Sequence, residues 1–472
     1  MNKEIRKPTL LESSLAILQM AFIVTIGFIG FKIRIEILMI LSAVIAGIMA
    51  IRLGFTYHDL EKGICEKMMK ATPSILLIWT IGMVIASFMF SGSVPMVIRF
   101  GLELVKPKYI YVCSFFVCSV LSLATGTSWG SAATGGVAMM GVAAGMGVPL
   151  HINAAAIICG SILGDKLSPL SDTTNLAPLC CDISIYDHIK SMLWTTLPSS
   201  LISLIVFWIL GMNINVTHVG MSDTAIGMIS SLDRIYDWNF LLLIPFIVLL
   251  LGALLKFPPI LVMIVSSIVA LAVGTFVQDF NVISGLEACV NGFKIETFYN
   301  RDVYDLILTL LNRGGIKSMV GIVVIVYCGY AYAAIVEKAG FLEKVTEPLL
   351  AKCHSRVSLV AASLIVNFLI AACSGSSYAA FIITGETFSK EYDKHNIGRC
   401  VLSRSMEDSG TMMMPLVPWT TASVFYAATL GVSAYGAGGY ALYSINTYLN
   451  PIMAILIAFL GIGMYQTKKF SK

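Results

Sequence analysis

The sequence contains little charge for its length. Only 12% of its 472 residues are charged and 57% are hydrophobic, whereas soluble chains carry about 25% charged residues. So few charged side chains cannot cover the surface of a soluble protein of this size. The composition therefore excludes an ordinary soluble domain and indicates a protein embedded in a lipid bilayer.

Several motifs of nucleotide and metal chemistry are missing. The chain has no Gly-x-x-x-x-Gly-Lys-Ser/Thr loop for ATP, and no Cys-x-x-Cys or Cys/His spacing for zinc. Its 11 cysteines lie mostly inside apolar runs, where cysteine acts as a small apolar filler. No nucleophile–base pair and no basic patch stand out. We therefore expect no enzyme, no resident cofactor and no nucleic-acid partner, and an ion gradient as the energy source.

Long apolar runs occupy most of the chain instead. Typical runs cover residues 14–31, 238–255, 260–277 and 451–465. About 20 apolar residues in a helix cross the hydrocarbon core of a bilayer, and these runs lack the alternation of barrel strands. The sequence predicts an all-α polytopic membrane protein whose main partner is the lipid bilayer. We expect this membrane to be the cytoplasmic membrane of a bacterium.

Short segments of the first half recur, in the same order, in the second half. The matches pair 60–61 with 286–287, 82–86 with 329–333, 126–130 with 375–379, and 172–174 with 408–410. Long internal repeats of this kind are typical of secondary transporters. We expect a first transmembrane repeat at 1–212, an extracytoplasmic linker at 213–237 and a second transmembrane repeat at 238–472.

Each repeat shows the same series of apolar segments. In the first half, spans are expected at 14–31, 35–53, 73–91, 151–180 (broken) and 190–211, with an interfacial segment at 57–70 and paired arms at 108–125 and 131–146. In the second half, spans are expected at 238–256, 259–277, 317–337, 397–434 (broken) and 450–466, with arms at 357–374 and 377–388. If the arms cross the bilayer fully, each half has six spans; if they form a re-entrant hairpin, each half has five and the repeats are inverted.

Loop charges favour the re-entrant arrangement. Lysine and arginine are enriched in cytoplasmic loops, so Lys3, Arg6 and Lys7 indicate a cytoplasmic N-terminus. With five spans per half, the linker is outside, the segment 389–396 is inside, and the C-terminus is also cytoplasmic. Basic residues at 99–108 fall on the wrong side in this arrangement. We predict two inverted repeats of about five helices, each with a re-entrant hairpin and a broken helix.

Four polar clusters interrupt the apolar segments, at 125–131, 165–178, 374–377 and 407–418. Backbone that leaves a helix at membrane depth is costly unless it lines a cavity or packs against protein. Broken helices also expose carbonyls and helix ends, which bind ions. Each cluster alone could be a close helix contact made by small residues. Four clusters at equivalent places in two halves indicate ion sites.

Carboxylates in these clusters are the strongest candidates for exchange chemistry. A carboxylate at the bilayer centre is costly, and one removed from water binds a proton more readily, so it can trade a proton for a cation. We predict that Asp172 and Asp408 bind the cation and proton. Asp165, Glu407 and Arg404 are possible proton or charge-pair residues, since Asp165 could pair with Lys166, and Glu407 or Asp408 with Arg404.

A dehydrated sodium ion needs several oxygen ligands, and no single short loop supplies enough. We therefore expect each Gly-Ser/Thr tip to converge with the broken helix of its own half, with Asp172 and Asp408 in the interior. Gly126 and Gly375 should lie where helices start or stop. The added oxygens are predicted to come from Thr127, Ser128, Thr173, Thr174, Asn175, Ser376, Ser377, Ser409 and Thr411.

The longest polar run gives a specific resemblance. Gly164-Asp165-Lys166-Leu167-Ser168-Pro169-Leu170-Ser171-Asp172-Thr173-Thr174-Asn175-Leu176-Ala177-Pro178, with Gly126–Gly130 and the segment 407–419, resembles the NhaC family of sodium/proton antiporters. The resemblance implies inverted repeats, two re-entrant hairpins with sodium near their tips, and a substrate domain that moves against a scaffold, often in a homodimer. It implies Na+ and H+ as transported ions.

The same family contains exchangers of organic acids, such as a malate/lactate antiporter, and members that carry amino acids. Trp129, Tyr378 and Trp419, with Arg404 nearby, could serve an organic anion. The sequence thus leaves two functions open. The first is sodium/proton antiport, and the second is sodium- or proton-coupled transport of a small organic acid or amino acid.

Overall fold

The computed structural model describes residues 5–214, 223–255, 257–299, 305–351 and 353–465. All regular elements in these residues are helices, which confirms the all-α prediction. In the same residues, nine helices are long and apolar enough to cross a membrane, or ten if 225–235 and 240–252, bent by 103°, are counted as one span. The chain is therefore a multi-pass membrane protein.

The first half follows the predicted order of elements. It contains α1 (Leu10–Val24), η1 (Thr25–Gly30), α2 (Ile35–Arg52), α3 (Tyr57–Ser91), α4 (Ser93–Leu104), η2 (Pro107–Tyr109), α5 (Ile110–Thr125), α6 (Ser128–Ser131), η3 (Ala132–Gly136), α7 (Val137–Gly145), α8 (Leu150–Leu167), α9 (Asp172–Cys180) and α10 (Ile185–Met212). The predicted break in the span 151–180 is the segment between α8 and α9.

The second half contains long helices with additional short helices between them. It contains α11 (Asp223–Ile235), η4 (Phe240–Leu243), α12 (Ile244–Leu254), α13 (Pro259–Val277), α14 (Val282–Asn291), η5 (Ile295–Thr297), α15 (Asp305–Leu311), η6 (Ile316–Met319), α16 (Val320–Lys338), α17 (Phe341–Ala351), α18 (Arg356–Ser374), α19 (Ser377–Lys394), α20 (Arg399–Gly410), η7 (Met414–Leu416), α21 (Thr421–Leu430), η8 (Ala441–Tyr443) and α22 (Ile445–Leu460). The broken span 397–434 consists of α20, η7 and α21.

The prediction of a separate interfacial segment at 57–70 is wrong. The segment and the span after it form one helix, α3, of 35 residues. Thr56 begins the helix with a capping box to Asp59, and Gly92, at φ +83°, ends it. Pro73 lies inside the helix without ending it, as happens in membrane helices whose neighbours compensate for the missing hydrogen bond.

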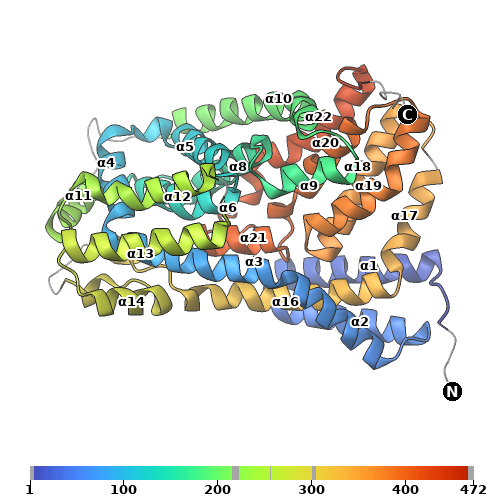
Figure 1. The fold of residues 1–472 in the computed structure, drawn as a ribbon, viewed down its shortest axis with the longest axis horizontal. Helices are drawn as coiled ribbons and strands as arrows, with labels where there is room; N and C mark the ends of the chain where they lie inside the picture. The colour runs from blue at the N-terminus through green and yellow to red at the C-terminus, as the bar shows by residue number, and fades with distance from the viewer. Residues whose placement is uncertain (1–4, 215–222, 256, 300–304, 352, 466–472) are drawn as a thin grey trace.

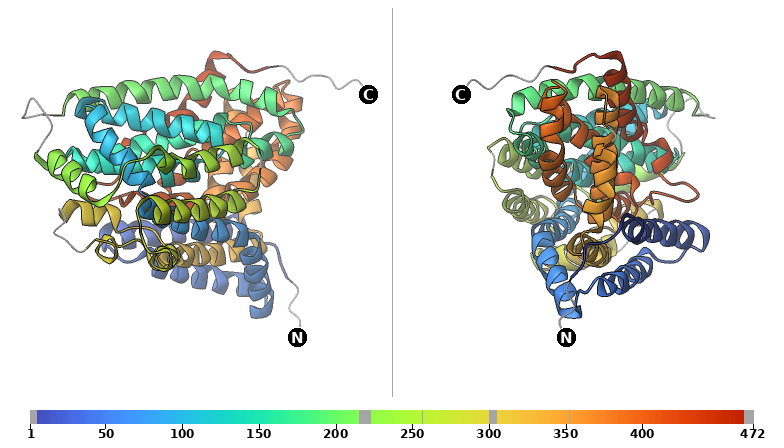
Figure 2. Two further views of the ribbon diagram at one scale, coloured as in Figure 1. Left: turned by 60° about the vertical axis from the view of Figure 1, so that its left-hand side comes forward. Right: turned by 90° about the vertical axis from the view of Figure 1, so that its right-hand side faces the viewer.

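The helices divide into two groups across the molecule. Helices α1, α2, α3, α14 and α16 lie in the lower part of Figure 1, and α5, α8, α10, α20 and α22 lie in the upper part. Both views of Figure 2 keep α10 and the first two helices at opposite edges. The upper group contains α8 and α20, with which the two broken helices begin, whereas α21 lies in the middle of the molecule beside α3.

The length of the hairpin arms does not decide whether they re-enter. The stretches 107–125 and 356–374 are themselves long and apolar enough to cross a membrane. In Figure 1, α5 lies toward the left of the molecule and α18 and α19 lie at its right. The two hairpins therefore approach the centre from opposite ends of the long axis.

Candidate functional site

Each hairpin turns at a glycine. Gly126 follows the last residue of α5 and Gly375 follows the last residue of α18, and both have φ +68°. This left-handed conformation is costly for residues with a Cβ atom. The prediction that these two glycines lie at helix ends is confirmed.

Substitution by alanine should distinguish the two tips. A Cβ at Gly126 would lie 2.6 Å from Leu170 Cβ and 2.7 Å from its carbonyl carbon, whereas a Cβ at Gly375 would lie 3.1 Å from Tyr330 Cε1. Gly375→Ala should cost about 1–2 kcal/mol for the backbone conformation, and Gly126→Ala about 2–5 kcal/mol because overpacking is added. Thermal unfolding of the purified variants in detergent measures this order. Equal midpoints would show that the Leu170 backbone moves aside freely.

The two tips meet in one cavity. It has a volume of about 310 Å³ and is called the tip cavity below. Its lining includes, from the first half, Thr127, Ser128, Trp129, Asp165, Asp172 and Thr173 and, from the second half, Tyr330, Gly375, Ser376, Ser377, Tyr378, Thr411 and Tyr426. The predicted convergence of Thr127 and Ser128 with Asp172 is therefore observed, and the second tip joins the same space.

Asp172 lies at the opening of this cavity, not in the interior. It is the first residue of α9 and is exposed. Its Oδ2 accepts a hydrogen bond from Tyr378 Oη of the second half. The prediction of an interior position is wrong because the break after α8 brings the start of α9 to the cavity wall, where a carboxylate stays solvated.

Asp165 is the buried carboxylate of the tip cavity. The residue is 7% exposed, and no described atom forms a hydrogen bond with its Oδ1. Most buried polar atoms have such a partner, so this oxygen is available for a ligand. The suggested pair between Asp165 and Lys166 is not formed. Adjacent residues of a helix point in different directions, and Lys166 contacts the second half instead.

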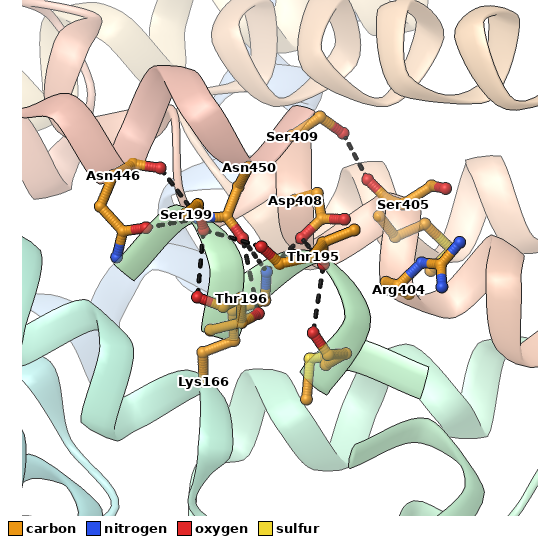
Figure 3. A network of polar contacts seen from close by, with 12 residues as sticks. Lys166, Thr195, Thr196, Ser199, Arg404, Ser405, Asp408, Ser409, Asn446 and Asn450 are labelled. Atoms are coloured by element: carbon orange, nitrogen blue, oxygen red, sulfur yellow. Dashed lines mark hydrogen bonds and ion pairs between the residues drawn. The ribbon is translucent and has the colours of Figure 1, made fainter. Parts of the chain in front are cut away.

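Lys166 forms a fully buried ion pair with Asp408 (Figure 3). The lysine Nζ also donates to Asn450 Oδ1 over 3.1 Å, and Thr195 Oγ1 donates to Asp408 Oδ1 over 3.0 Å. Asn450 Nδ2 in turn donates to Ser199 Oγ over 2.8 Å. This network joins α8, α10, α20 and α22, and the ion pair itself connects the two halves of the chain.

Asp408 is therefore interior, as predicted, but it does not lie beside its own tip. Ser409 accepts from Asn367 Nδ2 over 2.9 Å and donates to Ser405 O over 2.8 Å, within the same helix contact. Of the predicted ligands near Asp408, Thr411 lines the tip cavity. Ser377 Oγ donates to Gly410 O over 2.5 Å. Thr411 follows the last residue of α20, so its side chain leaves the helix that positions Asp408.

Glu407 and Arg404 are fully buried and do not bond to each other. Among the described residues, neither carboxylate oxygen of Glu407 has a hydrogen-bond partner. Arg404 donates from Nη1 to the carbonyls of Ser191, over 3.4 Å, and Gly463, over 3.3 Å. Among the described residues, the suggested local pairs of Arg404 with Glu407 or Asp408 are thus not formed. Arg404 instead ties α20 to α10 and to the end of α22.

Two of the predicted oxygen donors support the break between α8 and α9. Thr174 Oγ1 donates to the carbonyls of Asp165, over 3.2 Å, and Lys166, over 3.1 Å. Asn175 Nδ2 donates to Pro169 O over 2.9 Å and to Ser171 O over 2.6 Å. These bonds satisfy carbonyls that the helix break leaves free. They keep the chain turned so that Asp165 and Asp172 reach the same cavity.

The aromatic candidates differ in position. Trp129 lines the tip cavity and stacks on Phe425, with ring centroids 4.7 Å apart, and Tyr378 lines the cavity beside Asp172. Trp419 is not among the lining residues and donates from Nε1 to Ala372 O over 2.7 Å. Of the described residues that line the cavity, none is Lys, Arg or His. The expected role of Arg404 beside an organic anion does not fit this arrangement.

The sequence reasoning missed the residues around the ion pair. Thr195 and Asn450 lie in apolar helices, where single polar residues are also common at helix contacts. Lys166 carried a usable signal, because a lysine inside a run of apolar helix is costly and needs a buried partner. The identity of that partner could not be read locally, because Asp408 lies 242 positions later.

Comparisons with known proteins agree with this geometry. Residues 160–462 match the Na+/H+ antiporter family. The chain is 36% identical to an uncharacterised Na+/H+ antiporter of Haemophilus influenzae, over 98% of both chains. It is 32% identical to the Na+/H+ antiporter NhaC of Alkalihalophilus pseudofirmus, over 94% of both chains. It is 30% identical to a malate-2H+/Na+-lactate antiporter of Bacillus subtilis, over 99% of this chain and 98% of that one.

Proposed function

The chain belongs to the Na+/H+ antiporter family and exchanges sodium for protons across a membrane, and we propose that this exchange takes place in the tip cavity. The observation that carries the assignment is the meeting of both hairpin tips with Asp165 and Asp172 in one cavity. Sodium prefers oxygen ligands. Carboxylates, hydroxyls and carbonyls released at the helix breaks supply them here.

Asp165 and Asp172 are the carboxylates that trade a proton for sodium in this proposal. Asp165 is buried with a free oxygen, and Asp172 stands at the entrance. Removing a carboxylate from water without a counterion is costly, so either Na+ or H+ must accompany Asp165 when the cavity closes. Competition between the two ions for one buried carboxylate gives their exchange. The remaining ligands are proposed to be Thr127, Ser128, Thr173, Ser376, Ser377 and Thr411.

The Lys166–Asp408 pair has a supporting role in this proposal. Its two charges are already matched, and the surrounding Thr195 and Asn450 complete its hydrogen bonds. An ion pair whose charges and hydrogen bonds are already matched requires no sodium ion for charge balance. We infer that it fixes the two broken helices relative to each other, so that the ligands from both halves stay in register.

Reconstitution tests the proposed function directly. Purified protein in liposomes, with an internal pH dye, should acidify or alkalinise the interior when a sodium gradient is imposed. The flux should saturate with sodium, because a finite site binds it. A wild-type protein that moves no protons under a sodium gradient, yet takes up malate or lactate, would replace this proposal by the organic-acid function. The described lining residues include no Lys, Arg or His, which weighs against that organic-acid function.

The finer topology follows the sequence prediction. We propose two inverted repeats with re-entrant hairpins, in the cytoplasmic membrane of a bacterium, with both termini cytoplasmic and a homodimer as the assembled form. The approach of the hairpins from opposite ends of the molecule supports inversion. The basic N-terminal residues support the orientation.

Cysteine labelling checks this topology. Ser230, in α11, and Lys394, the last residue of α19, are both exposed. The two helices lie toward opposite ends of Figure 1. In a background without the 11 native cysteines, Ser230→Cys should react with an impermeant maleimide from outside. Lys394→Cys should react only in inverted vesicles. Reaction of both from one side would exclude the proposed arrangement.

A further inference from the structure

The tip cavity is larger than a sodium ion requires. A water molecule occupies about 30 Å³ in the liquid, so a cavity of about 310 Å³ has room for several waters or for a small organic molecule. Sites for small molecules combine apolar and aromatic walls with a few placed polar groups. The cavity can therefore hold a ligand larger than a single sodium ion.

The charges of the lining select a cation. Asp165 and Asp172 are the ionisable acids of the lining, and the described lining residues include no Lys, Arg or His. Asp165 is 7% exposed and its Oδ1 has no hydrogen-bond partner among described atoms. A buried carboxylate oxygen of this kind attracts an N–H donor or another positive group. An organic acid would instead meet two like charges.

The aromatic residues of the lining narrow the class of cation. Trp129, Tyr330, Tyr378 and Tyr426 surround the carboxylates, and Tyr378 is fixed by its hydrogen bond to Asp172. Aromatic faces attract quaternary and other alkylated ammonium groups, which are weakly hydrated, and contribute little to binding of a strongly hydrated sodium ion. Carboxylates next to several aromatic rings are the combination that binds a substituted ammonium.

We propose that the tip cavity accepts a small organic ammonium ion in place of sodium. Its positive nitrogen would lie against Asp165 and Asp172, and its carbon atoms would contact the aromatic side chains of the wall. The inference rests on the proposed function, because it uses the carboxylates assigned to sodium. It adds a substrate class, organic cations, and excludes organic anions from this site.

Choline and tetramethylammonium are suitable probes, because a quaternary ammonium cannot cross the bilayer as a neutral base and disturb the pH gradient. In proteoliposomes of the full chain, each should raise the sodium concentration needed for half-maximal proton flux, as a competitor does. Malate and lactate at the same concentration should have no effect. Titration of choline into the purified protein in detergent, by calorimetry, measures binding without transport, and sodium should displace it.

Two matched variants test the role of the aromatic wall. Trp129→Leu should weaken choline about three- to tenfold relative to sodium, which is the range expected for loss of a cation–π contact. Trp419→Leu removes an aromatic residue outside the lining and should leave the ratio of choline to sodium affinity unchanged. Equal effects of the two variants on this ratio would overturn the aromatic assignment.

The outcomes separate the two proposals. Sodium-driven flux without competition or binding by either ammonium ion would overturn the inference and leave the proposed function standing. Choline binding that sodium displaces, in a protein without sodium-driven proton flux, would support the cation site and overturn the antiport mechanism assigned to it. Competition by malate or lactate, and not by choline, would overturn the inference by showing that the cavity selects anions.

Discussion

Asp165→Asn and Asp172→Asn proteins should fold and purify, yet need far more sodium than the wild type to drive proton movement. Asparagine keeps the shape of the side chain and removes the charge, which also removes a desolvation cost at Asp165. Interactions with a charged group contribute about 1.5–3 kcal/mol, so the sodium concentration for half-maximal flux should rise about tenfold to a hundredfold. We expect the larger effect at Asp165, because its carboxylate is buried and Asp172 is partly solvated.

Asp182→Asn is the matched control for these variants. Asp182 is an exposed carboxylate in the turn after α9, with φ +61°, a conformation that asparagine adopts readily. The substitution removes the same charge close in sequence but outside the tip cavity. Its flux should equal that of the wild type. Unchanged sodium dependence in Asp165→Asn and Asp172→Asn would remove both residues from the exchange mechanism.

Breaking the interior ion pair should destabilise the fold more than any single change in the tip cavity. Lys166→Met leaves Asp408 charged and unpaired, and Asp408→Leu does the same to Lys166, although both residues are fully buried. Removing one partner of a buried pair costs about 3–5 kcal/mol. The midpoint of thermal unfolding in detergent should therefore fall strongly in each single variant.

The double variant Lys166→Met with Asp408→Leu should recover a large part of this loss. Replacing both charges by apolar groups leaves no unpaired charge, and such replacements are often nearly neutral. Part of the cost remains, because Thr195 and Asn450 lose hydrogen-bond partners. A double variant that is as unstable as the sum of the two single losses would show that the pair does not act as a unit.

Much of the fold could be predicted because membrane helices and their interruptions leave local signals. The breaks at Gly126, Gly375 and after Leu167 are polar or glycine residues inside apolar runs, and the structure has helix ends at each. Helix α3 was harder, because Pro73 and the polar stretch before it resemble a boundary. A proline stops a helix in isolation, whereas neighbouring helices can hold it inside a span.

The sequence predicts the residue types of the candidate site better than it predicts which of these residues contact one another. Clusters of oxygen donors around Asp165 and Asp172 follow from the sequence, and both reach the tip cavity. Which acid is buried and which is paired depends on contacts between helices far apart in the chain. Asp408 was therefore assigned to the ion site, although the structure pairs it with Lys166 from the other half.

This ion pair also makes the two proposed repeats unequal. In the repeat register that aligns Asp172 with Asp408, the position equivalent to Lys166 is Leu402, a buried apolar residue. The lysine therefore has no counterpart in the second half, and Asp172 and Asp408 lie in different environments. A transporter with two identical inverted halves could adopt an inward-open and an outward-open conformation of equal energy. In this chain one fixed interior charge pair removes that degeneracy, so the empty carrier should rest with one face open in preference to the other.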